Sequence, residues 1–159
     1  MATKKNRGKG FEREVRDGFE KILDVSVDRL KDTQARFKDN DNVADFIIYS
    51  EPTQIYIECK TRRGNTLNFK NDIRPNQWQG LYEKSLIKGV KAGILVWFID
   101  HDITAWVDIA TLQEMRANGE KSLHYKDIEK YNLFKVSARK KQVYYEYDFY
   151  PLLQELKGA

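Results

Sequence analysis

The chain has 159 residues, of which 41% are hydrophobic, and this is enough for one domain with its own core. It carries 28 Lys and Arg against 24 Asp and Glu, and its single cysteine, Cys59, excludes both an internal disulfide and a cysteine-based zinc site. No apolar run is long enough to cross a membrane, and the basic N-terminus lacks the apolar stretch of a signal peptide, so we expect a cytoplasmic protein without a membrane partner.

In chain order, the pattern predicts a polar, flexible, basic arm at residues 1–8 and one folded domain over residues 9–159. The expected elements are a helix at 10–23, strands at 25–30, 43–49 and 54–60, a helix at 75–88, strands at 93–99 and 103–108, a helix at 109–117, a strand at 142–147 and a helix at 149–156. Residues 31–42 are expected to form a polar stretch, and 65–74 an irregular loop. This order predicts an α/β fold in which a central mixed β-sheet is flanked by helices.

Basic residues are concentrated in three stretches of the chain, which are the first sixteen residues, residues 29–38 and residues 60–74. One such stretch would be ordinary solvated surface, but three around one candidate site favour a polyanion such as DNA. The candidates for DNA contact are Arg7, Lys9, Arg29, Arg36, Arg62, Arg63, Lys70 and Arg74.

The most informative stretch is the end of the predicted strand 54–60, where Glu58, Cys59 and Lys60 follow apolar residues. Because strand side chains alternate, Glu58 and Lys60 share one face, while Cys59 points the other way as a small core residue. Burying charge costs free energy unless the charge is paired or binds something. The two charged residues are therefore either an exposed ion pair or part of a site.

Two further acidic residues can join Glu58. If strands 43–49 and 54–60 pair through the turn between them, Asp45 approaches Glu58, and two adjacent carboxylates stay ionised only beside a cation. Oxygen ligands of this kind suit Mg²⁺ or Mn²⁺. Glu12 lies within the apolar stripe of the first helix, and such a metal would give it a partner.

Each of these residues also has a simpler interpretation. Glu58 and Lys60 can form an ordinary ion pair, Asp45 can cap a turn, and Glu12 can pair with Arg16 on its own helix. Taken together, the carboxylates, a divalent metal and a lysine predict phosphodiester hydrolysis. The metal would acidify a bound water, and Lys60 would orient or deprotonate that water or stabilise the transition state.

The order of a helix glutamate, an aspartate and a Glu-x-Lys motif resembles the PD-(D/E)XK nuclease superfamily, here as Glu12, Asp45 and Glu58-Cys59-Lys60. The segments NRGKGFEREV, DRLKD, NDIRPNQWQGL and GVKAGILVWF resemble the phage branch of the RecU-type Holliday junction resolvases. This resemblance implies a restriction-endonuclease-like core with Mg²⁺, replaceable by Mn²⁺, bound by Glu12, Asp45, Glu58 and the main-chain carbonyl of Cys59. It also implies Lys60 as the catalytic lysine and Gln77 as a supporting residue.

The same resemblance implies a homodimer that nicks opposing strands of a four-way DNA junction during recombination or repair, in a bacterial host and encoded by the host or a phage. No small-molecule cofactor is expected. The chain departs from cellular RecU proteins in the short stretch 29–42, where they carry a projecting stalk, and in Val43, where they carry a threonine. Two alternatives therefore stay open, which are a nuclease with the same site acting on other branched or duplex DNA, and a non-catalytic DNA-binding module.

Overall fold

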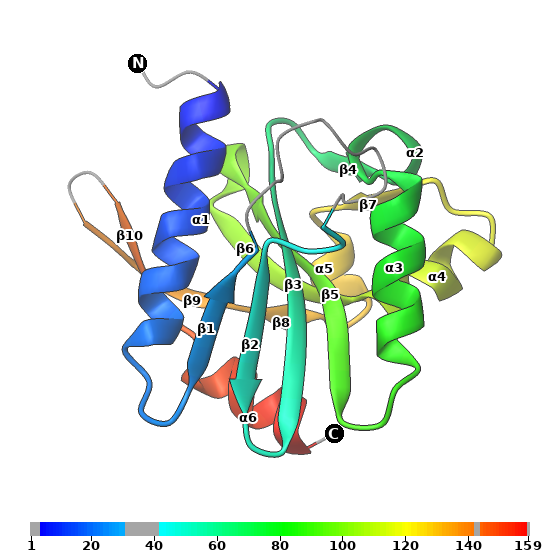
Figure 1. Cartoon of the computed structure of the whole chain (residues 1–159). Helices are drawn as coiled ribbons and strands as arrows, with labels where there is room; N and C mark the ends of the chain where they lie inside the picture. Colours follow the sequence, from blue (N-terminus) through cyan, green and yellow to red (C-terminus); the bar gives the residue numbers. More distant parts are fainter. Residues whose placement is uncertain (1–3, 31–41, 142–143, 159) are drawn as a thin grey trace, which may run out of the picture.

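The sheet at the centre of the molecule has six strands in the order β1-β2-β3-β5-β6-β8 (Figure 1). The structure is a computed structural model, and it describes residues 4–30, 42–141 and 144–158. The central strands are β1 (Ser26–Arg29), β2 (Phe46–Ser50), β3 (Thr53–Arg62), β5 (Val90–Phe98), β6 (Ile103–Asp108) and β8 (Phe134–Lys135). Two small sheets stand apart, formed by β4 (Thr66–Asn68) with β7 (Ser122–His124) and by β9 (Ser137–Lys140) with β10 (Tyr145–Asp148).

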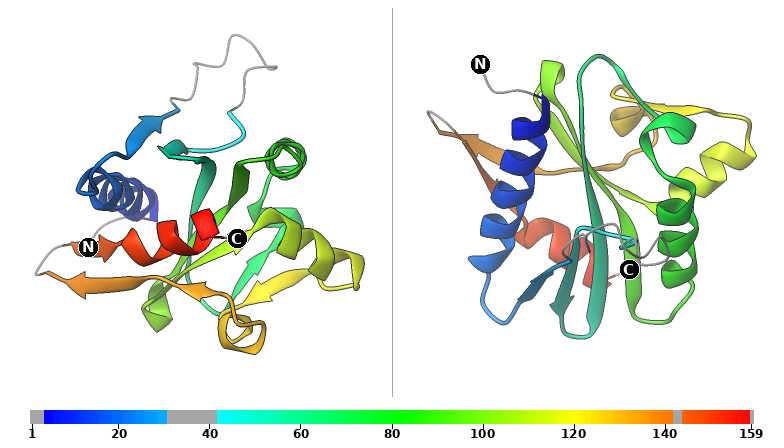
Figure 2. Two further views of the ribbon diagram at one scale, coloured as in Figure 1. Left: turned by 90° about the horizontal axis from the view of Figure 1, so that it is seen from below. Right: turned by 45° about the horizontal axis from the view of Figure 1, so that its top comes forward.

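Helices cover both faces of this sheet, as the rotated views show (Figure 2). The helices α1 and α6 lie on one face, and α3 and α4 lie on the other. The helical elements are α1 (Lys4–Glu20), α2 (Phe69–Asp72), α3 (Pro75–Ser85), the 3₁₀ turn η1 (Ile99–His101), α4 (Ile109–Ala117), α5 (Asp127–Lys130) and α6 (Tyr150–Gly158).

Strands β3 and β5 are parallel, and all the other pairs in the central sheet are antiparallel. A parallel pair needs a crossover, which α3 supplies, and Pro75 stands at its first turn, where the missing N–H costs nothing. The register pairs Glu58 with Ile94 and Lys60 with Val96. The carboxyl ends of β3 and β5 therefore meet at one edge of the sheet, beside the start of α3.

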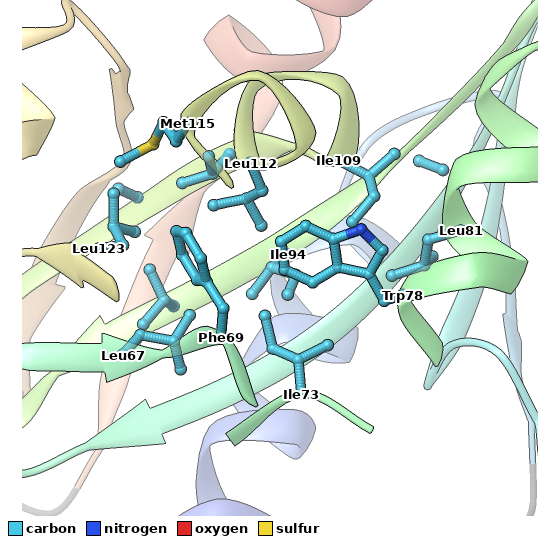
Figure 3. Packing of buried hydrophobic residues seen from close by; sticks show 14 of the residues in the cluster. Leu67, Phe69, Ile73, Trp78, Leu81, Ile94, Ile109, Leu112, Met115 and Leu123 are labelled. Atoms are coloured by element: carbon cyan, nitrogen blue, oxygen red, sulfur yellow. The ribbon is translucent and has the colours of Figure 1, made fainter. Parts of the chain in front are cut away.

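Alternation along β3 divides the core into two clusters. Tyr56 belongs to the cluster under α3 and α4, and Ile55 and Ile57 belong to the cluster under α1 and α6. In the first cluster, the rings of Phe69 and Trp78 meet at 5.3 Å between α2 and α3 (Figure 3). Since β3 is covered on both faces, Glu58 near its carboxyl end is buried, and the polar residues that follow it, Lys60 to Arg62, are half-buried.

The predicted mixed α/β sheet flanked by helices is confirmed, but several local predictions are wrong. The first helix begins at Lys4, so residues 4–8 are helical and not a flexible arm. Residues 65–74 contain β4 and α2 in place of an irregular loop, while β7, α5, β8 and β9 were not predicted. The helix predicted at 75–88 ends at Ser85. The strand predicted at 142–147 begins at Tyr145, and residues 142–143 of that prediction lie outside the described part of the chain.

None of the helices in the described part of the chain is long and apolar enough to cross a membrane.

Gly93 lies where β5 is pressed between β3 and β6, and the structure leaves no room for a side chain there. A Cβ atom at this position would lie 2.3 Å from the Val107 carbonyl oxygen and 2.8 Å from the Trp106 ring. We expect Gly93→Ala to lower the free energy of unfolding by about 1–3 kcal/mol, because the backbone of β6 must move. Gly10→Ala is the control, since its Cβ meets no atom within 4 Å. Chemical denaturation measures both, and a Gly93→Ala variant as stable as wild type would contradict this packing.

Candidate active site

Asp45 is held immediately before β2 by three hydrogen bonds. Its backbone N–H donates to the Ile57 carbonyl (2.9 Å), and its carbonyl accepts from Leu30 N–H (2.8 Å). Its side-chain Oδ2 accepts from the Cys59 backbone N–H (2.8 Å). These bonds tie Asp45 to β3 beside the Glu58 position, so the predicted approach of these two acids is confirmed, although Asp45 precedes its strand and is not within it.

The Glu58 carboxyl is the most deeply buried charged group of the site, with only 3% of the residue exposed. Its Oε2 accepts from Gln77 Nε2 (2.5 Å) and lies 3.3 Å from Lys60 Nζ. Burial, reinforced by repulsion from the adjacent Asp45 carboxylate and a hydrogen bond with it, raises the pKa of Glu58 to about 9, and Lys60 only partly opposes this. Without a cation, the pair of carboxyls of Asp45 and Glu58 therefore holds a proton at neutral pH.

Lys60 and Gln77 complete the cluster from the same side of the sheet. Lys60 Nζ donates to Gln77 Oε1 (3.4 Å), while the same amide donates to Glu58. Gln77 is 3% exposed on the first turns of α3, so its amide bridges the two charged ends of the Glu-x-Lys motif. The shared face of Glu58 and Lys60 predicted from alternation is confirmed.

Glu12 lies on α1, on the face of the sheet opposite α3 and Gln77. Its Oε2 accepts from Arg29 Nη2 (2.9 Å), whereas Arg16 Nε lies 3.9 Å from Asp17. Its negative charge still acts on Cys59, where burial, Asp45, Glu58 and Glu12 together raise the thiol pKa. Within residues 4–30, 42–141 and 144–158, no three His, Cys, Asp or Glu side chains are arranged to hold a metal. The structure thus joins Asp45 and Glu58, and Glu12 as a third ligand stays a prediction.

The basic residues proposed for DNA contact have different surroundings. Arg62 Nη1 pairs with Asp72 (3.2 Å), and Arg63 Nη1 pairs with Asp100 (2.7 Å), so both guanidinium groups are ordered by acids that sequence reasoning missed. Neither Asp72 nor Asp100 belongs to a sequence motif, and each lies well beyond its arginine along the chain. Lys9 and Arg29 line a hollow of about 420 Å³ together with Glu12. Arg7 lies on α1, Lys70 and Arg74 lie at the exposed surface near the start of α3, and Arg36 lies outside the described residues.

These residues form the pattern of a known nuclease family. The family described as "Phage putative PDDEXK endonuclease" matches residues 3–147. The chain belongs to this family. As predicted from the sequence, we expect Asp45 to supply the aspartate of the PDDEXK pattern, and Glu58 and Lys60 its Glu-x-Lys end. The observed cluster is therefore the candidate active site of a PDDEXK nuclease.

The fold of this PDDEXK chain is also that of a solved resolvase structure. It is similar to Hjc, a Holliday junction resolvase from the archaeal hyperthermophile Archaeoglobus fulgidus, with a TM-score of 0.59 and 15% sequence identity. The match covers 80% of this chain and 95% of Hjc, and at this identity it shows a shared fold. No curated protein sequence matches the chain.

The raised pKa of Glu58 predicts how stability depends on pH when no divalent cation is present. Unfolded, Glu58 loses its proton near its ordinary pKa of about 4.5, whereas folded it keeps the proton up to about 9. Its contribution to stability is therefore full below pH 4.5 and is lost as the pH rises through this window. We expect thermal unfolding in EDTA to show a falling Tm from pH 5 to pH 9, with a clearly smaller fall for Glu58→Gln.

Glu83→Gln is the matched control, because Glu83 lies on the exposed side of α3. If Glu58→Gln and Glu83→Gln both followed the wild-type pH profile, the assigned environment of Glu58 would be wrong.

Proposed function

We propose that this chain is a Mg²⁺-dependent endonuclease that resolves four-way DNA junctions as a homodimer, nicking opposing strands symmetrically. The observation that carries the proposal is the contact between the Asp45 and Glu58 carboxyls, with Lys60 and Gln77 bonded to the same group. Family membership supports the nuclease part of the proposal. The Hjc-like fold supports the choice of substrate.

The donor set fits a divalent cation. Two adjacent acids that share a proton form a site where a cation can replace that proton, and oxygen donors favour Mg²⁺, with Mn²⁺ as a substitute. Asp45, Glu58 and the main-chain carbonyl of Cys59 would hold the metal. Glu12 would join them by exchanging its bond with Arg29. When bound, the metal would supply positive charge to the phosphate and acidify a water molecule.

The protein side chains supply the rest of the reaction. Lys60 Nζ, one-fifth exposed, can reach a phosphate oxygen while it stays within 3.3 Å of Glu58, and there it would stabilise the negative charge of the transition state. The same ammonium group can orient the attacking water. Gln77 acts as a positioning residue, because its amide holds both the carboxyl of Glu58 and the ammonium of Lys60.

A homodimer accords with the symmetry of the substrate. A four-way junction has approximate two-fold symmetry, and two copies of one active site related by a two-fold axis meet two equivalent strands. This arrangement accounts for paired nicks without a second kind of catalytic site. Recombination or repair in the cytoplasm of a bacterial host is the process in which such a product is needed, and a phage origin agrees with the family description.

The cleavage test compares four-way junction, fork and linear duplex DNA in Mg²⁺. We expect paired symmetric nicks in the junction, and a rate reduced at least about 100-fold in Asp45→Asn and Lys60→Ala, since each removes a group that acts on the reacting phosphate. The controls Asp24→Asn and Lys88→Ala change exposed residues and should cut at the wild-type rate. Normal cutting by Asp45→Asn and Lys60→Ala would refute the assigned site.

Cutting of all three DNAs alike would favour the alternative of a nuclease with a broader target. Binding without any cutting in Mg²⁺ or Mn²⁺ would favour the non-catalytic module.

Dimerisation is tested separately. We expect light scattering at micromolar concentration to give about twice the mass of the 18.8 kDa chain, either alone or with junction DNA. A mass of one chain under both conditions, together with unpaired nicks, would contradict the homodimer.

A further inference from the structure

The β9–β10 ribbon is a small sheet of its own that extends from the body beside α1 (Figure 1). All four residues of β9 are exposed, although a strand covered by the fold would bury one face. Its register pairs Lys140 with Tyr145 and Arg139 with Glu146. Strand β9 therefore contributes little to the hydrophobic core, and the side chains of β9 face the solvent.

Strand β10, in contrast, anchors the ribbon firmly. Tyr147 is 3% exposed and shares a hydrogen bond with Thr104 (3.1 Å). The Tyr145 backbone N–H donates to Glu14 on α1 (3.1 Å), and its hydroxyl donates to Asp102. The ribbon is therefore held against the body along β10 and is not a loose loop.

The exposed strand is strongly basic. Residues 135–141 contain four Lys or Arg and no acidic residue. The one acid opposite, Glu146, already pairs with Lys21 (3.2 Å) and lies 3.6 Å from Lys141. Within the described residues, Arg139 has no carboxylate at ion-pair distance. One carboxylate, that of Glu146, is thus shared between Lys21 and Lys141, and the excess positive charge of this strand among the described residues is complementary to a polyanion.

The turn end of the ribbon, where Tyr145 pairs with Lys140, lies against the end of the sheet that carries the active site. The Tyr145 ring packs edge-to-face on Trp97 at 5.4 Å. Trp97 is the β5 partner of Thr61, which follows the catalytic Lys60 directly on β3. A basic strand that lies at this end of the sheet can reach DNA beside the cut position, and the major groove of a duplex admits a two-stranded β-ribbon.

We propose that the β9–β10 ribbon is a DNA-binding arm, in which Arg139, Lys140 and Lys141 contact the phosphates of a duplex segment flanking the cleavage position. This inference rests on the proposed function as a DNA endonuclease and adds a contact surface to it. The arm increases affinity and positions the duplex, while the chemistry stays with Asp45, Glu58 and Lys60. None of these three residues is among the candidates for DNA contact that the sequence predicted.

The test removes these charges and measures both binding and cutting. The arm variant is Arg139→Gln/Lys140→Gln/Lys141→Gln, and the control Lys88→Gln/Lys126→Gln/Lys130→Gln removes the same charge from exposed positions elsewhere. Fluorescence anisotropy in EDTA gives the affinity for a four-way junction with arms of about 15 base pairs, longer than one helical turn, at several salt concentrations. Circular dichroism checks that both variants fold like wild type.

We expect the arm variant to bind at least about tenfold more weakly at low salt, with a slope of log K against log salt smaller by about 2–3, because each lost phosphate contact removes about 0.9. The single variant Arg139→Gln should lower the slope by about 0.9. The control should keep the wild-type slope. In Mg²⁺, single-turnover cutting at saturating enzyme should stay within about twofold of wild type, since no group of the reaction is changed.

An unchanged slope of log K against log salt in the arm variant, or an equal loss of affinity and slope in the control, would overturn the proposal. The lysines would then serve to keep an exposed strand from self-association. A lost cutting rate at saturating enzyme would overturn it as well. The two proposals fail separately. Wild type that binds through the arm without cutting refutes the endonuclease, and wild type that cuts while the arm variant binds normally refutes the arm.

Discussion

The burial of one carboxyl group, that of Glu58, constrains the whole edge of the sheet around it. A group so enclosed needs either a proton or positive charge, and the neighbours that bond to it come from β3 itself, from the residue before β2 and from α3. Asp45 is fixed before β2, Lys60 lies two residues on along β3, and Gln77 reaches in from α3. The right placement of these groups depends on the parallel crossover, which brings the start of α3 to the carboxyl end of β3.

The arginines around this edge are arranged by acids more than the sequence indicates. Arg29 pairs with Glu12, Arg62 with Asp72 and Arg63 with Asp100, so their guanidinium groups are oriented and partly neutralised within the protein. The net positive charge that a polyanion meets is therefore shifted toward groups without such partners. This explains how a chain with a net charge of only +4 can present a locally basic surface on the β9–β10 ribbon.

The parts of the fold with a strong hydrophobic period could be predicted from sequence. Strand β3 and helix α3 were located because their apolar residues repeat over many positions, and the face shared by Glu58 and Lys60 followed from alternation alone. Strand β4 could not be predicted, because it has three residues and pairs with β7 more than fifty positions away. No local pattern therefore indicates it. Only the pairing makes residues 65–74 regular.

The same distinction holds for the site. The approach of Asp45 to Glu58 followed from strand pairing through a short turn, which is a local feature. The partner of Glu12 could not be deduced, because Arg29 is seventeen residues away and meets it only after α1 packs on β1. Gln77 was identified through the family resemblance, since a glutamine on a helix carries no chemical signal until its amide is seen to bridge Lys60 and Glu58.

The two ends of β3 differ in how well they should tolerate modification, because Glu58 and Lys60 lie toward its carboxyl end. The turn that starts β3, at Glu51 and Pro52, meets the end of the α3 crossover, where Gln54 N–H donates to the Gly89 carbonyl (2.9 Å). Six residue-to-residue steps of extended strand, roughly 20 Å, separate Pro52 in this turn from Glu58. A fluorescent label or a fused protein attached at this turn would stand clear of DNA bound at the proposed site, so the protein could be followed or tethered without disturbing cleavage there.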